Sequence, residues 1–246
     1  MGEQLSDEEK KEFLGIANSE TDRLTRLVND VLDLSKIESG RTIQLEPLNI
    51  SPAIEQTIRN YKLNAEEKNV IIEQEIEQNI PTILGNWDLL LQVFDNLIGN
   101  GLKFSKPGSM IKLRAYTWPD TCSASQFEAI SEAPHCEIIS PMPKVRIEIA
   151  DSGYGISAVD QERIFERFFR VEESVHTETG TGLGLSIVRG IIEKHGSKIE
   201  MVSEYGIGTT FWFDLTLESS DADALFLEST KKNSWRLDKD YSEYDG

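Results

Sequence analysis

Three glycines at alternate positions, Gly180, Gly182 and Gly184, lead directly into an amphipathic segment from Leu183 to His195. Glycine lets a backbone approach a ligand closely, and the first N–H groups of a helix attract anions. The run from Gly180 to Ser186 therefore predicts a phosphate cradle at the start of a helix. Alternate glycines also occur in tight turns, so this run alone leaves an ordinary turn open.

A second glycine-rich stretch begins at Asp151, directly after a strand predicted over Lys144 to Ala150. A carboxylate at a strand end lies over a pocket, and Gly153 and Gly155 allow close backbone approach there. Such a carboxylate can accept a hydrogen bond from the amino group of adenine. An aspartate that only stabilises a turn is the alternative.

A helix predicted from about Trp87 to Phe104 carries Asn96 and Asn100 on one face, with Lys103 one turn on. Asparagine is a middling helix former, so two on one face need a reason. A neutral oxygen ligand for Mg²⁺ beside an ammonium for phosphate oxygens is the functional reason. A solvated polar face is the alternative, and the two glycine stretches favour the functional one.

The asparagine helix, the Asp-x-Gly-x-Gly turn and the glycine run, in that order, resemble the nucleotide-binding domain of sensor histidine kinases. The resemblance covers about Leu5 to Leu217. It implies an α+β fold, a two-layer α/β sandwich with a mixed β-sheet covered on one face by helices, preceded by a long bundle-forming helix. It also divides the chain into a partial dimerisation domain (1–40), a catalytic ATP-binding domain (41–218, with an insertion at 117–143) and an acidic tail (219–246).

The first segment, Leu5 to Ser39, reads as one long helix with Ser6 as N-cap and Gly40 as the stop. Its apolar residues repeat at seven, as in Leu24 and Val31, which suits a helix bundle or coiled coil. A helix packed on its own domain is the alternative. The segment also resembles the second helix of the sensor kinase dimerisation hairpin, which implies a homodimer through this helix.

The remaining pattern predicts alternating strands and helices, and a polar lid over ATP from Val171 to Thr179. Strands are expected at Thr42–Pro47, Val70–Ile76, Ile111–Tyr116, Lys198–Ser203 and Thr209–Leu217, and helices at Ile50–Lys68 and Asp160–Arg170.

The resemblance implies catalytic roles for Asn96, Lys103 and Arg170, and a Mg²⁺ ligand at Asn100. Asn96 stands where related gyrase and chaperone ATPases carry a water-activating glutamate, and an amide cannot act as a general base. The full set of residues that the resemblance places around ATP is Asn96, Asn100, Lys103, Phe104, Asp151, Gly153, Gly155, Ile156, Arg170, Gly180, Thr181, Gly182, Leu183, Gly184, Leu185 and Thr209.

The resemblance implies a parent protein that transfers the γ-phosphoryl group of ATP to a histidine and then to an aspartate in the receiver domain of a response regulator. The family's acceptor histidine precedes an acidic residue, whereas His135, His176 and His195 precede Cys, Thr and Gly. We therefore expect a fragment that lacks the acceptor segment and does not phosphorylate itself. A related-fold ATPase and a non-catalytic dimerisation or binding module stay open as alternatives.

Net charge limits the partners, because 25 Lys and Arg oppose 43 Asp and Glu, a formal charge of −18. This charge repels phosphate backbones and anionic lipid, so nucleic acid and membrane surfaces are poor partners. No apolar run is long enough to span a membrane, and Cys122 and Cys136 form neither a disulfide framework nor a metal spacing. We expect a soluble, cytoplasmic chain whose parent protein can be anchored to a membrane through upstream segments.

Overall fold

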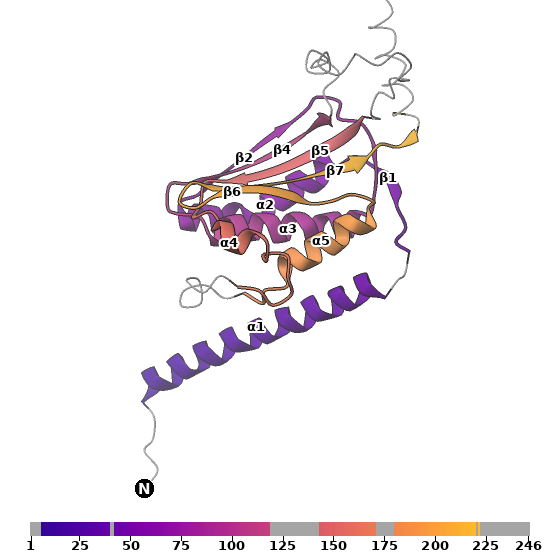
Figure 1. Cartoon of the computed structure of the whole chain (residues 1–246). Coiled ribbons are helices and arrows are strands. Elements are labelled where there is room, and N and C mark those ends of the chain that lie inside the picture. The colour runs from indigo at the N-terminus through magenta and orange to yellow at the C-terminus, as the bar shows by residue number, and fades with distance from the viewer. Residues whose placement is uncertain (1–5, 40–41, 119–142, 171–179, 220, 222–246) are drawn as a thin grey trace, which may run out of the picture.

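The computed structural model describes residues 6–39, 42–118, 143–170, 180–219 and 221 (Figure 1). A long helix comes first in the chain, and strands and helices then follow in mixed order. The elements are α1 (Asp7–Glu38), β1 (Glu46–Leu48), α2 (Ser51–Lys68), β2 (Ile71–Ile76), β3 (Ile83–Gly85), α3 (Trp87–Lys103), β4 (Met110–Trp118), β5 (Lys144–Asp151), α4 (Ala158–Gln161), α5 (Gly184–Lys194), β6 (Glu200–Glu204) and β7 (Gly208–Thr216).

Five strands form one mixed sheet in the order β2-β4-β5-β7-β6. β2 and β4 are parallel, and the other neighbours are antiparallel. Alternate residues of each strand point to opposite faces, so Ile111, Leu113 and Ala115 of β4 are buried on one face while Met110 and Arg114 are exposed on the other. β1 and β3 form a separate antiparallel pair.

Three helices, α2, α3 and α5, cover the apolar face of the sheet (Figure 1). The core between the two layers contains fully buried side chains from both, such as Phe94 and Leu97 of α3 and Ile147 and Phe213 of the sheet. Burial of this apolar surface supplies the main driving force for folding. The predicted two-layer sandwich with a mixed sheet is confirmed.

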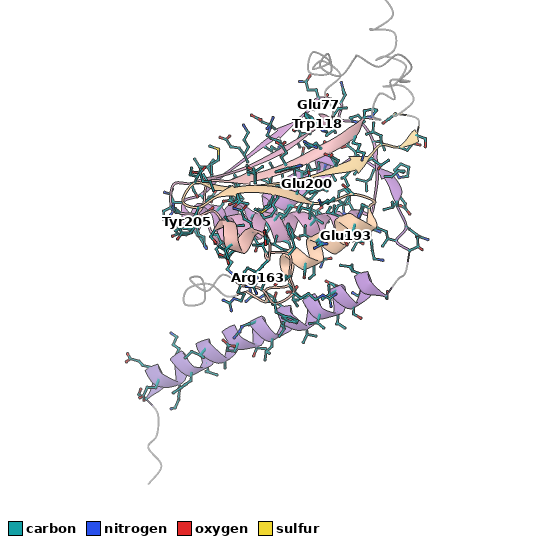
Figure 2. All side chains as sticks on the ribbon, viewed as in Figure 1. Glu77, Trp118, Arg163, Glu193, Glu200 and Tyr205 are labelled. Atoms are coloured by element: carbon teal, nitrogen blue, oxygen red, sulfur yellow. The ribbon has the colours of Figure 1, made fainter. Side chains whose placement is uncertain are left out.

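The other face of the sheet carries polar and aromatic side chains instead of a second helix layer in the described residues (Figure 2). Arg146 donates two hydrogen bonds to Asp214, at 2.7 and 2.9 Å, and its guanidinium lies 4.3 Å from the ring centroid of Trp118. Tyr116 donates to Glu148 at 2.6 Å. Burial and this carboxylate raise the pKa of Tyr116 to about 12.

α1 begins with a capping box in which the Ser6 hydroxyl accepts from the Glu9 N–H and the Glu9 carboxylate accepts from the Ser6 N–H. Its C-terminal half packs against α5, with Ile37 against Gly190. Its N-terminal half extends beyond the domain, where Phe13 and Leu14 are exposed (Figures 1 and 2). The predicted long helix with Ser6 as N-cap is confirmed.

The prediction of a helix over Asp160–Arg170 is wrong. α4 ends at Gln161, and turns with bonds such as Glu166 N–H to the Arg163 carbonyl follow it. Phe168 has a left-handed backbone, with φ +60°, so no helix can continue through it. In this segment Phe165 packs edge-on against Phe211 of β7, a contact between residues far apart in the chain that local spacing does not reveal.

The short strands at the edge of the domain also differ from the prediction. β1 covers only Glu46–Leu48, against the predicted Thr42–Pro47, and its partner β3 at Ile83–Gly85 is not among the predicted strands. The Gly40 helix stop and most of the insertion, the lid and the acidic tail lie outside the described residues. Asp221 is one tail residue that is described, and its carboxylate accepts a hydrogen bond from the Thr82 N–H at 2.8 Å.

Candidate nucleotide site

α3 positions the two asparagines and the lysine. The helix starts at an N-cap, Asn86, whose side chain accepts from the Leu89 N–H, and buried Leu90 and Val93 fix which face turns to the core. Asn96 and Asn100 are one turn apart and half-buried. The helix therefore presents a row of polar groups along one side.

The polar row has both engaged and open members. Asn96 Nδ2 donates to the Gln92 carbonyl at 2.9 Å, while Asn100 makes no side-chain hydrogen bond within the described part of the chain. Lys103 Nζ lies 4.7 Å from the ring centroid of Phe104. Asn100 and Lys103 are three residues apart on one side of the helix, so an amide oxygen and an ammonium are both available for a phosphate with a hard cation.

The glycine run meets this row at the start of α5. A Cβ on Gly184 would lie 2.6 Å from Asn96 Oδ1, and one on Gly180 would lie 2.7 Å from Lys103 Nζ. Gly182 has φ +73° and lies against the backbone of Phe168. Glycine is therefore the residue that lets the backbone approach α3 this closely.

The N-terminus of α5 has no side-chain cap among the described residues. Its N-cap is Leu183, which is fully buried and cannot cap with its side chain. Leu185 in the first turn is half-buried. The first N–H groups of α5 therefore begin beside Asn96 without a side-chain cap, an arrangement that favours an anion at the helix start.

Asp151 lies at the end of β5, on the helix-covered face of the sheet, beside Gly101 of α3. Its carboxylate accepts from the Gly153 N–H at 2.9 Å and from the Thr209 N–H. Burial raises the pKa of Asp151, and these two hydrogen bonds oppose that rise. The carboxylate is thus held by backbone donors in a partly buried position.

The turn after Asp151 fits only glycine at its two key positions. A Cβ on Gly153 would meet the Phe104 carbonyl, and one on Gly155, where φ is +67°, would meet the Glu204 carbonyl. Tyr154 N–H donates to the same Phe104 carbonyl at 3.1 Å. The turn is therefore clamped between the end of α3 and the end of β6.

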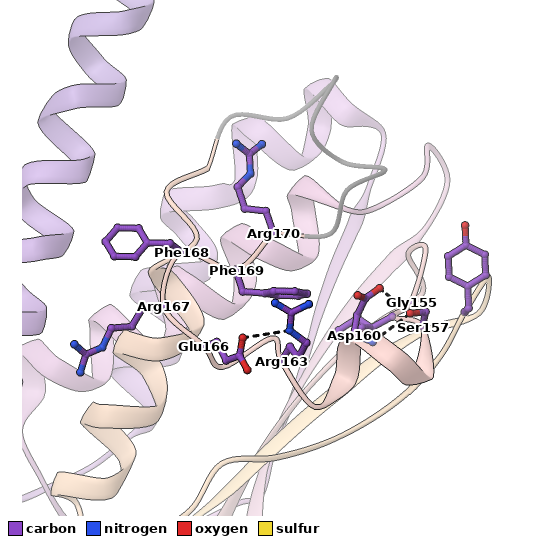
Figure 3. Close-up of a pocket in the computed structure, with 11 residues that line it drawn as sticks. Gly155, Ser157, Asp160, Arg163, Glu166, Arg167, Phe168, Phe169 and Arg170 are labelled. Carbon is purple, nitrogen blue, oxygen red and sulfur yellow. Dashed lines mark hydrogen bonds and ion pairs between the residues drawn. The ribbon is translucent and has the colours of Figure 1, made fainter.

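Next to this turn lies a hollow of about 730 Å³ that contains Gly155, Ile156 and Arg170 but not the α3 asparagines or the glycine run (Figure 3). Arg163 donates to Glu166 at 3.3 Å and stacks on the ring of Phe169, with 4.5 Å between guanidinium and centroid. Figure 3 shows Arg167 and Arg170 extending to different sides of this segment. The hollow therefore borders the candidate site on the side of the aromatic turns.

α1 touches the candidate site twice. Thr181, within the glycine run, donates to Asp30 at 2.6 Å, and Gln92, one turn before Asn96, donates to Asp33 at 2.8 Å. Thr181 also accepts from the Leu183 N–H at 3.3 Å. The glycine run and α3 are thus each hydrogen-bonded to the same long helix, a link that the apolar pattern of α1 did not reveal.

Two family models match the chain, one over the segment that contains α1 and one over most of the domain that contains the sheet. Residues 85–219 match the histidine kinase-, DNA gyrase B- and HSP90-like ATPases, and residues 1–40 match the His kinase A (phospho-acceptor) domain. The chain belongs to the sensor histidine kinases. The ATPase match includes α3, the Asp151 turn and the glycine run.

Curated relatives include a drug sensory protein and a sensor-like histidine kinase. The chain is 53% identical over 219 residues to drug sensory protein A of Synechocystis sp. (strain PCC 6803), and 49% identical over 217 residues to the sensor-like histidine kinase ycf26 of Porphyra purpurea. These alignments cover 89% and 88% of the chain but 31% and 32% of those proteins. The chain thus spans about a third of the length of the histidine kinases it matches.

Solved structures share the fold. Full-length ShkA in complex with AMPPNP superposes with a TM-score of 0.65 and 27% identity, over 87% of this chain and 40% of that one. Histidine kinase ThkA in complex with the response regulator protein TrrA superposes with a TM-score of 0.62 and 23% identity, over 87% and 53% of the two chains.

Within this histidine kinase fold, the predicted residues fall into two groups. Asn96, Lys103, Gly180 and Gly184 lie against one another between α3 and α5, and Asp151, Gly153 and Thr209 lie together at the strand ends. Ser203 of β6 was missed by sequence reasoning, although its hydroxyl hydrogen-bonds Ile156 and Thr209. A lone serine in a strand gives no signal of such contacts.

His195 has a structural place in the kinase domain. It is buried, its Nδ1 donates to the Ile191 carbonyl and its Nε2 accepts from the Asn86 N–H at 3.0 Å. Burial lowers its pKa, so the ring is held neutral. Both ring nitrogens of His195 are therefore engaged inside the domain.

Proposed function

We propose that this chain is the ATP-binding catalytic part of a protein that phosphorylates a histidine and passes the phosphoryl group to an aspartate of a response regulator. Membership of the histidine kinases and the two residue groups of the candidate site support this proposal. The observation that carries it is the N-terminus of α5, which has no side-chain cap and begins at Gly184 beside Asn96. ATP and receiver domains are cytoplasmic, so the proposed activity is too.

The residue roles in the proposal are those that the resemblance to sensor histidine kinases implies. Asp151 accepts the adenine amino group, Phe104 and Ile156 line the base, and Thr209 lies beside them. At the other end, Lys103 and Arg170 neutralise phosphate charge while the α5 N–H groups hold phosphate oxygens. The glycine run and Leu185 supply the backbone of that cradle. Catalysis by such a site is positioning and charge neutralisation.

Mg²⁺ fits the donor set. No group of three or more His, Cys, Asp or Glu side chains gathers as a metal cage in the residues that the structure describes. One unengaged amide oxygen, that of Asn100, suits a Mg²⁺ held mainly by the nucleotide's phosphates and water. When bound, the ion neutralises phosphate charge. Asn96 orients groups at the phosphates and cannot remove a proton.

In the proposed reaction, the bond between the γ-phosphorus and the ADP oxygen breaks as a P–N bond forms to an imidazole. We propose that the chain's own histidines are not this acceptor. Residues 1–40, which match the phospho-acceptor family, contain no histidine, and both ring nitrogens of His195 are engaged. His135 and His176, which lie outside the described residues, are set aside because neither precedes an acidic residue, so on this proposal the acceptor belongs to another segment or chain.

A homodimer through α1 belongs to the same proposal. Leu24, Val28, Val31 and Leu32 are each at least 44% exposed although they follow helical spacing. A second copy of α1 would bury this apolar stripe, as in a helix bundle. Sedimentation equilibrium should show a dimer that a Leu24→Asp/Val31→Asp variant converts to monomer. A wild-type monomer at high concentration would contradict the dimer.

The test of the proposed function is a calorimetric titration of the chain with ATP, with and without Mg²⁺. We expect binding that weakens without the metal and in Asn100→Ala, but not in Asn60→Ala, a matched change at an exposed position of α2. Steady phosphate release would favour a related-fold ATPase. Failure of the folded chain to bind ATP would leave a non-catalytic binding module.

A further inference from the structure

Four residues lie side by side across the sheet at the end that carries Asp151. Ile111 on β4 pairs with Asp151 on β5, Asp151 pairs with Thr209 on β7, and Thr209 pairs with Ser203 on β6. Strand alternation puts this row on the helix-covered face, together with buried Ile111. Ser203 is therefore one strand from Thr209 and two from Asp151.

The Ser203 hydroxyl has three partners. It lies 2.8 Å from the Ile156 N–H nitrogen, 2.9 Å from the Gly208 carbonyl oxygen and 2.9 Å from Thr209 Oγ1. A hydroxyl has one proton to donate and two lone pairs that accept. Because an amide N–H can only donate and a carbonyl can only accept, the Ser203 proton goes to Gly208. Its lone pairs accept from Ile156 and from the Thr209 hydroxyl.

This assignment determines what Thr209 can offer a ligand. Its hydroxyl proton is committed to Ser203, so toward any other group its oxygen only accepts. The neighbouring Asp151 carboxylate, already held by the Gly153 and Thr209 N–H groups, also accepts. Two acceptors at one place favour an amino group over a carbonyl at that position of the base, because a carbonyl oxygen would face two acceptor oxygens with no proton between them.

The position of Ser203 is itself fixed by a second side chain. Gln161 Nε2 donates to the Ile156 carbonyl at 2.9 Å and to the Ser203 carbonyl at 3.0 Å. The backbone that carries Ser203 and the backbone of its partner Ile156 are thus joined by one side chain.

We propose that Ser203 is a positioning residue that sets the base specificity of the nucleotide site, by holding the Thr209 hydroxyl as an acceptor for the amino group of adenine. The inference rests on the proposed function, since it assumes that a purine nucleotide occupies the site. Ser203 does not touch the nucleotide in this arrangement. It acts by accepting the Thr209 hydroxyl proton, which leaves the Thr209 oxygen as an acceptor.

The experiment compares ATP with ITP, in which a carbonyl replaces the amino group at position 6 of the purine. Dissociation constants for both are measured on the wild type, Ser203→Ala, Thr209→Val and the double variant. The ratio of the ITP constant to the ATP constant should fall about 3- to 10-fold in Ser203→Ala, the size of one hydrogen bond. The freed Thr209 hydroxyl can then donate to the carbonyl of ITP.

Three comparisons separate this role from a merely structural one. Ser203→Thr keeps the hydroxyl and should restore the ratio, and Thr210→Ala, on the opposite face of β7, should not change it. In the Thr209→Val background, Ser203→Ala should have no further effect on the ratio, because the cycle isolates the pair. A structural loss would weaken ATP and ITP equally.

The outcomes distinguish a failure of the proposed function from a failure of the role of Ser203. If the wild type binds neither nucleotide, the proposed function fails. If it binds ATP and Ser203→Ala leaves the ITP-to-ATP ratio unchanged, the role of Ser203 is wrong while the proposed function stands. Should Ser203→Ala not fold, Thr209→Val decides, because an unchanged ratio in that variant also overturns the inference.

Discussion

At the strand ends, Asp151, Thr209 and Ser203 already have hydrogen-bond partners inside the protein. Between α3 and α5, by contrast, Asn100 has none in the described residues and the N-terminus of α5 is not capped by a side chain. We call these the base end and the phosphate end of the candidate site. The first resembles a preformed pocket, and the second leaves donors and acceptors for a ligand to satisfy.

The difference has a physical origin. A row of paired strands brings backbone N–H groups to fixed places, so a carboxylate such as Asp151 is satisfied by the fold itself. A helix N-terminus always leaves several N–H groups without an intrahelical partner. The phosphate end therefore keeps free hydrogen-bonding capacity as a consequence of helix geometry, and specificity for the base depends on the sheet.

Breaking the base end should have the largest effect. Gly155→Ala places a Cβ against the Glu204 carbonyl and a non-glycine residue at φ +67°. Left-handed strain and steric overlap together should cost about 3–5 kcal/mol of unfolding free energy. Urea denaturation measures it. Gly206→Ala, at φ +87° with no atom near its Cβ, should show only the strain of about 1–2 kcal/mol. Equal losses would contradict the overlap with Glu204.

Removing a charge at the phosphate end should separate the two ends by ligand. Lys103→Met should weaken ATP binding about 10- to 100-fold, because a charged hydrogen bond to phosphate is lost, and leave adenosine within about twofold. Asp151→Asn should weaken both ligands by a similar factor. Lys62→Met, at an exposed position on α2, is the charge-matched control. If Lys103→Met weakened adenosine binding as much as ATP binding, the base end and the phosphate end would not act separately.

The pH dependence of the unfolding free energy should report on the hydrogen bond between the end of α5 and the start of α3. His195, at the C-terminus of α5, accepts from Asn86 at the start of α3, and burial lowers its pKa. Since the unfolded state takes up this proton first, the stabilisation is present above the ordinary histidine pKa of about 6.5 and is lost as pH falls through the folded value.

Chemical denaturation of the wild type and His195→Gln between about pH 8 and pH 5 checks this expectation. The difference in unfolding free energy between the two should shrink as the pH falls below about 6.5. A difference that stays constant over the whole range would mean that His195 is not held neutral by the fold.

The smallest effect is expected from the helix that borders the phosphate end. Asp30→Asn keeps an acceptor for Thr181 but removes a negative charge next to the phosphate cradle. ATP affinity should rise about two- to fivefold at low salt, and adenosine affinity should not change. Glu20→Gln, the same charge change at an exposed site of α1, is the control. A rise for adenosine as well would assign the effect to packing.

Local patterns in the sequence predicted the parts of this fold that local forces decide. The spacing of apolar residues predicted α2, α3 and α5 to within a few residues, and the cap at Ser6 set the start of α1. The aromatic segment after Asp160 was misread because Phe165 packs on β7, a contact between residues far apart in the chain. The prediction of β1 and β3 was incomplete for the same reason, because these two strands pair although they are far apart in the chain.

For the candidate site as well, some residues could be predicted from the sequence and others could not. Residue type and spacing were enough to nominate Asn96, Asn100 and Asp151 as candidates. The hydroxyl of Ser203 and the carboxylate of Asp30 could not be nominated, because each is defined by a partner on another element. Sequence motifs indicate the residues that face a ligand, whereas the residues that hold those in place are visible only in three dimensions.

The parallel pairing of β2 with β4 has a consequence for how the domain folds. Two parallel neighbours need a crossover connection, and here the segment from residue 77 to residue 109 supplies it and contains α3. The chain cannot close this pair without laying the asparagine helix across the sheet. Closure of a long loop is slow, so the helix and the strand pair should appear together late in refolding. Assembly of the candidate site is therefore part of completing the sheet.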